Sequence, residues 1–272
     1  MEGATAARCS PQFSIIEETA DYIVVDKPAR LLVHPTKPDG APTLWHELRQ
    51  LLAYELANAG QISIVNRLDR ETSGIVLVAK THAAARRFSM LLQSQRIEKE
   101  YHALVWGWPE WETITSNAPL LRQGSVRPSH IYLKQASDEA GASALTHFAV
   151  EDRVEKMTTN GKHFSWIRAR PVTGRTHQIR VHLAALGYPI VGDKIYGPDE
   201  NCYLRFIETG WTEELATTLL LPRQALHASR LRIGSEHEWR CPLPSDLRSF
   251  IPENEEEGEF IAKKQLFPMV SR

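Results

Sequence analysis

The chain has 272 residues, of which 42% are hydrophobic and 24% charged, and its formal net charge is -1. These values are typical of a globular protein that can bury a sizeable core. We expect no membrane span, because no apolar run approaches the roughly 18 residues of a spanning helix. We expect no signal peptide, because Met1 to Thr5 lack its basic end and apolar stretch. We therefore expect a cytoplasmic protein with no membrane partner. The charge does not indicate a nucleic-acid-binding protein, although an overall balance can hide a local basic patch.

Cofactor and metal signals are missing from the sequence. The three cysteines, Cys9, Cys202 and Cys241, are far apart and lack the spacing of metal ligands or of a disulfide framework. Neither a Walker loop nor a G-x-G-x-x-G fingerprint occurs. We expect no cofactor and no bound metal ion.

The first third of the chain predicts a strand, a loop and a helix. Residues 1–12 are small and polar, and we expect a poorly ordered lead-in. Residues 22–27 are typical of a strand that Pro28 ends. After a proline-rich loop, leucines at helical spacing from Thr43 onward predict a helix that ends before Gly60.

The next elements alternate between strands and helices. Residues 63–69 and 74–80 read as two β segments joined by a polar turn. Thr81 is placed to cap a helix, and residues 101–106 predict another strand. Residues 109–143 are rich in turn formers and predict loops with short strands.

The last third predicts a hairpin, a helix and a final strand. The hairpin joins residues 144–150 to residues 164–171 around Asn160-Gly161. Thr173-Gly174 turns the chain into a helix that Gly187 caps. Residues 226–233 form the last clear strand.

Strands and helices therefore alternate without a βαβ rhythm, which favours an α+β fold with a mixed, largely antiparallel sheet flanked by helices and loops. We find no repeat and no domain boundary, and expect one domain over residues 13–250 followed by an acidic C-terminal tail at residues 251–272.

A first candidate site lies at Asn66-Arg67-Leu68-Asp69, which is followed by Thr72-Ser73-Gly74. In an extended segment Arg67 and Asp69 project to one face, and the cation favours the ionised carboxylate. Thr72 opens a turn that carries hydroxyl and backbone donors. A surface ion pair at a turn explains the same pattern, so spacing alone does not identify a catalytic residue.

A second candidate is Tyr101, which opens an apolar strand after Lys99-Glu100. Its ring could stack on a nucleobase. A core tyrosine with a satisfied hydroxyl is the alternative.

A third candidate is the acid-free basic run from Arg168 to His182, which holds four arginines. On a helix His177 and Arg180 would share a face, and Arg175 would lie near the helix start, where phosphates bind well. A solvated basic face is the alternative.

Taken in order, these segments resemble the RluA-type family of RNA pseudouridine synthases. The matching pieces are residues 22–28 with 31–34, 67–69 with 72–74, 99–107, 173–182, 187–193 and 226–228. The resemblance extends over roughly residues 13–245, and it implies a pseudouridine synthase-like catalytic domain acting on a uridine that is flipped out of structured RNA.

The resemblance also implies residue roles. Asp69 is expected to be the catalytic aspartate, Tyr101 the tyrosine that stacks on the target base, and Arg180 the cation that pairs with the aspartate. Arg67 matches an arginine associated with displacing the flipped nucleotide. Thr72, Arg175 and His177 are the expected further RNA-binding residues, and rRNA or tRNA is the expected partner.

Two departures from the family pattern bear on function. Asn66 stands where the family usually has histidine, and asparagine cannot titrate near neutral pH, although it can hydrogen-bond. The first strand of the resemblance starts near residue 13, so we expect no S4-type RNA-binding module before it. RNA contact is then expected from the catalytic domain itself.

Two other functions use the same residues. A ribosome-assembly or RNA-binding factor could keep the fold without catalysis, and Asn66 is the one feature that favours it. A hydrolytic nucleobase glycosylase would use the same carboxylate but also needs a group that activates water, for which we find no candidate. We expect a monomer, because nothing indicates a large self-complementary apolar face.

Overall fold

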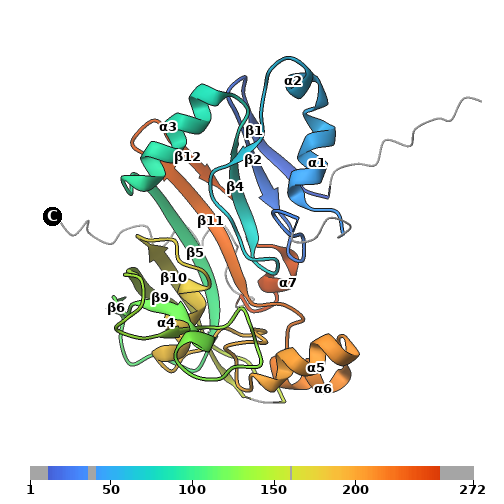
Figure 1. Cartoon of the computed structure of the whole chain (residues 1–272). Helices are drawn as coiled ribbons and strands as arrows, with labels where there is room; N and C mark the ends of the chain where they lie inside the picture. Colours follow the sequence, from blue (N-terminus) through green and yellow to red (C-terminus); the bar gives the residue numbers. More distant parts are fainter. Residues whose placement is uncertain (1–11, 36–40, 160, 252–272) are drawn as a thin grey trace, which may run out of the picture. The chain divides into compact units, whose positions relative to one another are not determined.

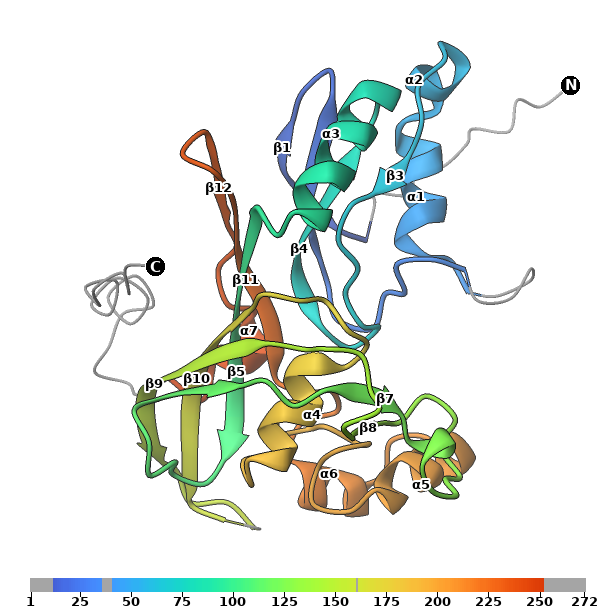
Figure 2. The ribbon, with the colours of Figure 1, turned by 60° about the vertical axis from the view of Figure 1, so that its left-hand side comes forward.

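The computed structural model describes residues 12–35, 41–159 and 161–251, and the chain divides into two compact units between Gln93 and Ser94. Each unit is an antiparallel sheet with helices beside it (Figures 1 and 2). The predicted α+β class with a largely antiparallel sheet is therefore confirmed.

The N-terminal unit, residues 1–93, is built around the strand β4, which is buried along its whole length. Strand β2 pairs antiparallel with β4 on one side and with β1 on the other. Strand β3 pairs antiparallel with the last two residues of β4, Val78 and Ala79. The elements of this unit are β1 (Ser14–Glu18), β2 (Tyr22–Lys27), α1 (Leu44–Leu51), α2 (Ala53–Ala57), β3 (Ser63–Ile64), β4 (Ser73–Ala79) and α3 (His82–Gln93).

Three predictions for this unit are confirmed and two are wrong. Strand β2 has the predicted bounds, α1 begins directly after Thr43 as predicted, and the Thr81 hydroxyl accepts from the Ala84 N–H as the predicted cap. The Thr43 hydroxyl also caps α1 by accepting from the His46 N–H, which the sequence did not predict. The helix predicted from Thr43 is interrupted at Leu52, whose ψ of 28° leaves the helical region. The strand predicted over residues 63–69 ends at Ile64, and the chain continues as an irregular segment.

The C-terminal unit, residues 94–272, has a sheet with the strand order β11-β5-β10-β9-β6, and β12 extends it by pairing with β11. All of these pairs are antiparallel. The strands are β5 (Ile97–Trp106), β6 (Thr113–Ser116), β7 (Leu120–Arg122), β8 (Gln135–Ser137), β9 (Thr146–Glu155), β10 (His163–Pro171), β11 (Leu226–Ile233) and β12 (His237–Arg240).

The predicted hairpin is β9–β10, which is longer than expected, and β11 has the predicted bounds. Strands β7 and β8 form a separate small pair within the segment for which short strands were predicted. The helices are η1 (Gln123–Ser125), α4 (Gln178–Ala185), α5 (Asn201–Thr209), α6 (Glu213–Leu219) and α7 (Ser245–Arg248). Helix α4 packs against β8, β9 and β10, and α5 and α6 lie side by side (Figures 1 and 2).

Helix α4 ends as the sequence predicts. Gly187 takes a φ of +88°, and its N–H donates to the Ala184 carbonyl while the N–H of Tyr188 reaches the Leu183 carbonyl. These two bonds make a Schellman cap, which favours glycine because of the left-handed conformation. The start of the helix was predicted wrongly: His177 is the residue before α4, with a left-handed φ of 56°. His177 and Arg180 therefore do not share a helix face.

Nearly all of the predicted lead-in at residues 1–12 and of the acidic tail at residues 251–272 lies outside the described residues. Within the described part of the chain, no helix is both long and apolar enough to cross a membrane.

Candidate active site

Asp69 lies in an irregular segment of the N-terminal unit that is fastened to β4 by a side chain. Asn66 is 6% exposed; its Nδ2 donates to the Ile75 carbonyl (2.9 Å), and its Oδ1 accepts from the Leu77 N–H (2.8 Å). One amide thus makes the donor and acceptor bonds that a paired strand residue would make through its backbone. Asn66 is a structural clamp, and the segment from Asn66 to Ser73 is called the Asp69 turn below.

A buried lysine holds the other side of the Asp69 turn. Lys27 is 0% exposed, and its Nζ donates to the carbonyls of Pro28 (2.7 Å), Leu31 (2.9 Å) and Arg70 (3.3 Å). Arg70 directly follows Asp69, so this ammonium fixes the backbone next to the carboxylate. The turn closes on itself through a bond from the Thr72 N–H to the Asp69 carbonyl (3.1 Å).

The side chains of the Asp69 turn differ in exposure. Asp69 is half-buried, Arg67 is exposed and Thr72 is 2% exposed. The segment is not a strand, but the exposures alternate in the predicted sense, because Leu68 between the two residues is 8% exposed. Arg67 lies near His34, whose pKa is lowered by partial burial and by the charge of that guanidinium.

Tyr101 lies on the central strand β5 of the C-terminal unit and is 8% exposed. Its neighbours across the sheet are Ala169 on β10 and Ala228 on β11, so small side chains flank the ring on both sides. Lys99 stands two residues earlier and hence on the same strand face. Burial lowers the pKa of the Lys99 ammonium, whose Nζ would be 3.6 Å from a Cβ added at Gly174.

Arg180 is buried on α4 and forms a two-pronged ion pair with Asp193. Its Nε donates to Oδ2 (2.7 Å) and its NH2 to Oδ1 (2.9 Å), with side-chain exposures of 5% and 0%. The N–H groups of Ile195 and Tyr196 also donate to Oδ1 of Asp193. Burial alone would raise the pKa of Asp193, but Arg180 and these N–H groups hold it below its usual range.

Tyr196 connects three parts of the C-terminal unit. Its hydroxyl oxygen lies 2.8 Å from Nδ1 of His177 and accepts from the Gln135 N–H (2.8 Å). The Arg180 guanidinium carbon lies 4.9 Å from the centre of its ring, within cation–π range. The structure therefore brings two predicted site residues, Arg180 and His177, together around a tyrosine.

Arg175 belongs to a loop that Gln178 organises. The amide oxygen of Gln178 accepts from the Thr173 hydroxyl (2.7 Å) and from the Arg175 N–H (2.9 Å). Its amide nitrogen donates to the Leu145 carbonyl (3.0 Å), so the loop is tied to the start of β9. The Arg175 side chain is exposed and reaches the Ser143 carbonyl through Nε (2.9 Å).

The basic run from Arg168 to His182 is divided between buried and exposed arginines. Arg168 is 8% exposed and lies 3.5 Å from Glu151, which also contacts His102 at 2.9 Å. Arg170 pairs with Glu100 at 2.7 Å. The alternative of a solvated basic face is therefore wrong for Arg168 and Arg180, which are buried beside carboxylates. Arg170 and Arg175 are exposed.

Comparison with known proteins places these residues in a family. A sequence profile described as RNA pseudouridylate synthase matches residues 21–185, which include both Asp69 and Arg180. A "Ribosomal large subunit pseudouridine synthase D" of Pseudomonas aeruginosa is 37% identical over 247 residues, covering 87% of this chain and 70% of that protein. The protein of the same description from Escherichia coli K12 is 35% identical over 261 residues, covering 90% and 72%.

The chain belongs to the RNA pseudouridylate synthase family. Members of this family isomerise uridine in RNA, so the predicted activity and RNA partner are confirmed at that level. Among solved structures, "Human RNA Pseudouridylate Synthase Domain Containing 1" has a TM-score of 0.64 and 27% identity, covering 92% of this chain and 89% of that one. The resemblance to the RluA-type family is confirmed.

Sequence analysis missed three residues of the synthase that support the site: Lys27, Asp193 and Tyr196. Asp193 could have been found, because an acid directly after the apolar Ile190-Val191-Gly192 needs a buried cation. Gly192 marks the same place: its φ is +77°, and a Cβ there would lie 1.9 Å from the Arg223 carbonyl oxygen. No local signal distinguishes the role of Lys27 or Tyr196.

Asp69 belongs to the N-terminal unit of the synthase, and Tyr101 and Arg180 belong to the C-terminal unit. Within each unit, the hydrogen bonds and ion pairs described above fix the positions of these residues. Among the described residues, no group of three or more His, Cys, Asp or Glu side chains is close enough to hold a metal ion.

Proposed function

We propose that this synthase converts a specific uridine of ribosomal RNA to pseudouridine, with Asp69 as its catalytic carboxylate. The choice of ribosomal RNA rests on the relatives described as large-subunit enzymes. The observation that supports Asp69 is its place at a half-buried turn whose backbone is held by Asn66 and Lys27. A surface ion pair would not need such bracing.

The reaction suits a single carboxylate. The N1–C1′ bond breaks, uracil leaves as a delocalised anion and rotates, C5 bonds to C1′, and the C5 proton is lost while N1 is protonated. Breaking a glycosidic bond builds positive character at the sugar, which a carboxylate can stabilise. Atoms and electrons balance without redox change, so these steps call on no cofactor. We assign no metal to the reaction.

We assign Tyr101 and Arg180 to the same reaction. Flipping the nucleotide costs a few kcal/mol, and stacking on the Tyr101 ring recovers part of this cost. We propose that Arg180 pairs with Asp69 during the reaction and favours the ionised carboxylate. The bond to Asp193 fixes the orientation of the Arg180 guanidinium within the C-terminal unit.

The RNA-facing roles fall to the more accessible residues. Arg67 and Arg175 are exposed, and both can reach phosphates around the emptied position. His177 is half-buried and contacts RNA from the edge of the same loop. Thr72 is 2% exposed, so we propose that it shapes the Asp69 turn from within rather than touching RNA.

The experiment is tritium release from unmodified transcripts labelled with 5-³H-uridine. Large-subunit rRNA and tRNA transcripts are tested in parallel with the wild type and with Asp69→Asn. We expect release from the rRNA by the wild type only. The variant should bind the same RNA within several-fold of the wild type, because the substitution keeps the size of the side chain.

Product analysis separates the alternatives. Pseudouridine in the digested RNA supports the proposal, and free uracil would instead indicate a glycosylase. Unchanged uridine despite measurable RNA binding would indicate a non-catalytic RNA-binding factor. Substantial activity in Asp69→Asn would remove Asp69 from the catalytic role.

We further propose that the enzyme works in the cytoplasm as a monomer. The curated relatives described above come from bacteria, in which ribosomal RNA is cytoplasmic, and the sequence of this chain shows no large self-complementary apolar face. Light scattering after gel filtration should give the mass of one chain at micromolar concentration. A dimer mass would overturn the second part of the proposal.

A further inference from the structure

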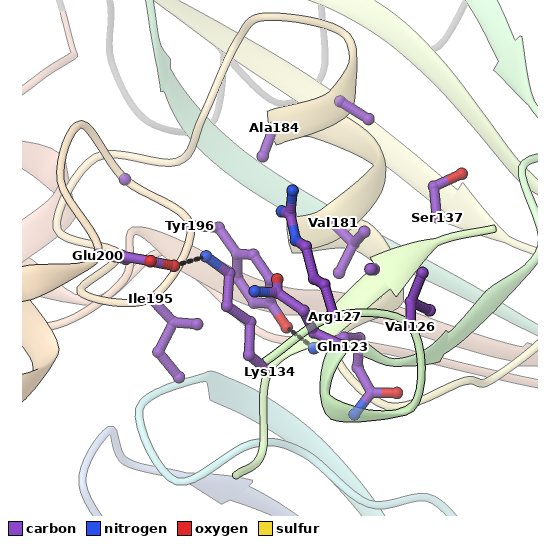
Figure 3. Close-up of a pocket in the computed structure, with 14 residues that line it drawn as sticks. Gln123, Val126, Arg127, Lys134, Ser137, Val181, Ala184, Ile195, Tyr196 and Glu200 are labelled. Atoms are coloured by element: carbon purple, nitrogen blue, oxygen red, sulfur yellow. Dashed lines mark hydrogen bonds and ion pairs between the residues drawn. The ribbon is translucent and has the colours of Figure 1, made fainter. Parts of the chain in front are cut away.

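A pocket of about 470 Å³ lies in the C-terminal unit, at a place to which sequence analysis assigned no function (Figure 3). This volume is within the range of about 300–1,000 Å³ that small-molecule sites occupy. Helix α4 forms one wall, the segment around η1 and β8 forms another, and residues 195–200 close the third side. The lining residues that matter below are Val126, Arg127, Lys134, Val181, Ala184 and Tyr196.

The walls of the pocket combine an apolar surface with a cation. Val181 and Ala184 present short apolar side chains from α4, and the ring of Tyr196 lies between them and the opposite wall (Figure 3). The Arg127 side chain extends into this space (Figure 3) and is exposed. It makes no hydrogen bond or ion pair with any residue that the structure describes, whereas Lys134 is paired with Glu200.

The segment that carries Arg127 is basic and free of acids. Residues 122–134 contain Arg122, Arg127 and Lys134 together with His130, and no aspartate or glutamate. At the start of this segment the Arg122 guanidinium carbon lies 4.3 Å from the ring centre of Tyr132, which is 73% exposed. Arg122 and Arg127 have no carboxylate partner among the described residues, and an exposed aromatic ring beside such cations is the composition that binds single-stranded RNA, through base stacking and phosphate contacts.

One lining residue, Tyr196, connects the pocket to the proposed catalytic residues. Tyr196 lines the pocket and also packs against the guanidinium of Arg180. Its hydroxyl lies 2.8 Å from Nδ1 of His177. An occupant of the pocket would therefore rest on the ring that Arg180 and His177 contact.

We propose that this pocket binds one unpaired nucleotide of the substrate RNA, next to the target uridine. Its base lies against Val181, Ala184 and Tyr196, and its phosphate pairs with Arg127. The inference rests on the proposed function, because it takes RNA as the substrate. It adds a recognition site that helps to select which uridine reaches Asp69.

Two variants and two matched controls test the pocket. Arg127→Gln removes the cation, and Ala184→Phe fills the apolar wall. The controls, Arg86→Gln and Ala83→Phe, make the same changes at exposed positions of α3. RNA affinity is measured in the Asp69→Asn background, and turnover is measured at saturating RNA in the wild-type background.

We expect both pocket variants to weaken RNA binding about tenfold and to leave turnover at saturation within about twofold. For Arg127→Gln the slope of log affinity against log salt should fall by about 0.7–0.9, the share of one phosphate contact. Combining the two variants should cost less than the sum, because both act on one occupant. Both controls should bind as the wild type does.

Substrates with an abasic nucleotide at each flanking position sharpen the test. At one flanking position, loss of the base should weaken RNA binding by the wild type about as much as Ala184→Phe does. For the RNA that is abasic at this position, Ala184→Phe should not weaken binding any further. If both folded pocket variants bind like their controls, the pocket is not an RNA subsite. Tight binding of free nucleoside monophosphates, with RNA affinity unchanged in Ala184→Phe, would also overturn the proposal.

The two proposals fail separately. If wild-type protein forms pseudouridine while the pocket variants match their controls, only the pocket assignment is lost. If the wild type forms no pseudouridine in any transcript, the proposed function is lost. If Ala184→Phe does not fold, Arg127→Gln and the abasic series still decide the question, because an exposed arginine carries little stability.

Discussion

Different kinds of interaction hold the two halves of the proposed site in place. Around Asp69 the support comes from hydrogen bonds to backbone groups: Asn66 bonds across to β4, and Lys27 gathers three carbonyls. Around Arg180 it comes from a carboxylate that is fully buried, Asp193. The first half orients a backbone turn, and the second orients a charge.

This difference follows from what each residue must do. A reacting carboxylate has to contact the substrate, and Asp69 is accordingly only half-buried. The bonds from Lys27 and Asn66 go to backbone groups and not to the Asp69 carboxylate. Arg180 is 5% exposed, and a buried cation is costly unless a counter-charge with good geometry accompanies it. The arginine half should therefore be the more sensitive to loss of a single charge. Asp193→Asn and Lys27→Met compare the two halves directly, and smaller effects are expected at His227 and Asn66.

The largest effect is expected for Asp193→Asn. The substitution keeps the size of the side chain but leaves the Arg180 guanidinium buried beside a neutral amide. Removing one partner of a buried pair typically costs about 3–5 kcal/mol. We expect a free energy of unfolding in urea lower by that amount, and a severe loss of tritium release under conditions where the variant is still folded.

Asp246→Asn is the matched control for this change. Asp246 accepts from Arg223, which is also buried, with the same two distances, 2.7 and 2.9 Å, but the Asp246 side chain is 43% exposed. We expect a smaller loss of stability than for Asp193→Asn and unchanged turnover, because solvent reaches this carboxylate and NH1 of Arg223 also donates to the carbonyls of Gln224 and Leu226. Equal losses in the two variants would show that burial of the carboxylate does not decide the strength of the pair.

Lys27→Met should give the next largest effect, in the other half of the site. Methionine fills a similar volume but leaves three carbonyls without their donor, so we expect a loss of about 2–4 kcal/mol. Turnover should fall as well, since the Arg70 carbonyl beside Asp69 is released. Chemical denaturation and tritium release at saturating RNA measure the two quantities.

The control for Lys27→Met is Lys80→Met in the same unit. Lys80 is also buried, but it pairs with the carboxylates of Glu18 (2.7 Å) and Glu55 (2.8 Å), away from the Asp69 turn. This variant should lose stability and keep its turnover. A similar fall in turnover for both lysine variants would mean that Lys27 acts only through overall stability.

The third effect depends on pH and belongs to the C-terminal unit. His227 is 1% exposed on β11, and burial lowers its pKa from 6.5 to about 3. In the unfolded chain His227 binds a proton below about pH 6.5, whereas in the folded protein it binds one only below about pH 3. The free energy of unfolding therefore falls as the pH drops from 6.5 towards 3. Between pH 7 and pH 4.5 this group should remove about 2–3 kcal/mol.

Urea unfolding at several pH values measures this slope, and His227→Gln should flatten it. Glutamine can still donate to the Cys241 carbonyl, which His227 Nε2 contacts at 3.1 Å. His82→Gln, at an exposed position of α3, provides the control for replacing a histidine by glutamine. An NMR titration in which the His227 ring protonates near pH 6 would contradict the prediction directly.

Much of the fold could be predicted from the sequence because local signals specify it. Strands β2 and β11 have the predicted bounds, and the Schellman cap at Gly187 follows from one glycine. The strand expected over residues 63–69 failed for a physical reason. A polar side chain, Asn66, replaces backbone pairing there, and no hydrophobic period reveals that exchange.

The site shows the same division. Family resemblance pointed to Asp69, Tyr101 and Arg180, because each stands inside an ordered set of motifs. Their supports could not be predicted, since the partners are far apart in sequence: 43 residues separate Lys27 from Arg70. The sequence of the basic run did not reveal its ion pairs for a related reason. The partners of Arg168 and Arg170, Glu151 and Glu100, lie on other strands.

The smallest effect is expected for Asn66→His, which restores the residue that the family usually has. A neutral imidazole offers one donor and one acceptor, the same pair that Asn66 uses toward Ile75 and Leu77. At pH 8 we expect stability within about 1 kcal/mol of the wild type and turnover within a few-fold. Below the pKa of the ring the acceptor is lost, so this variant alone should become less stable and less active as pH falls.

Asn66→Asp is the informative contrast, because a carboxylate can accept from Leu77 but places negative charge against the Ile75 carbonyl. It should be the more damaging of the two at pH 8, by about 2 kcal/mol. If Asn66→His instead raised turnover strongly at unchanged stability, position 66 would have a role in proton transfer, and the clamp would not be its whole function. If both variants behaved like the wild type, the Asp69 turn would be held by Lys27 alone.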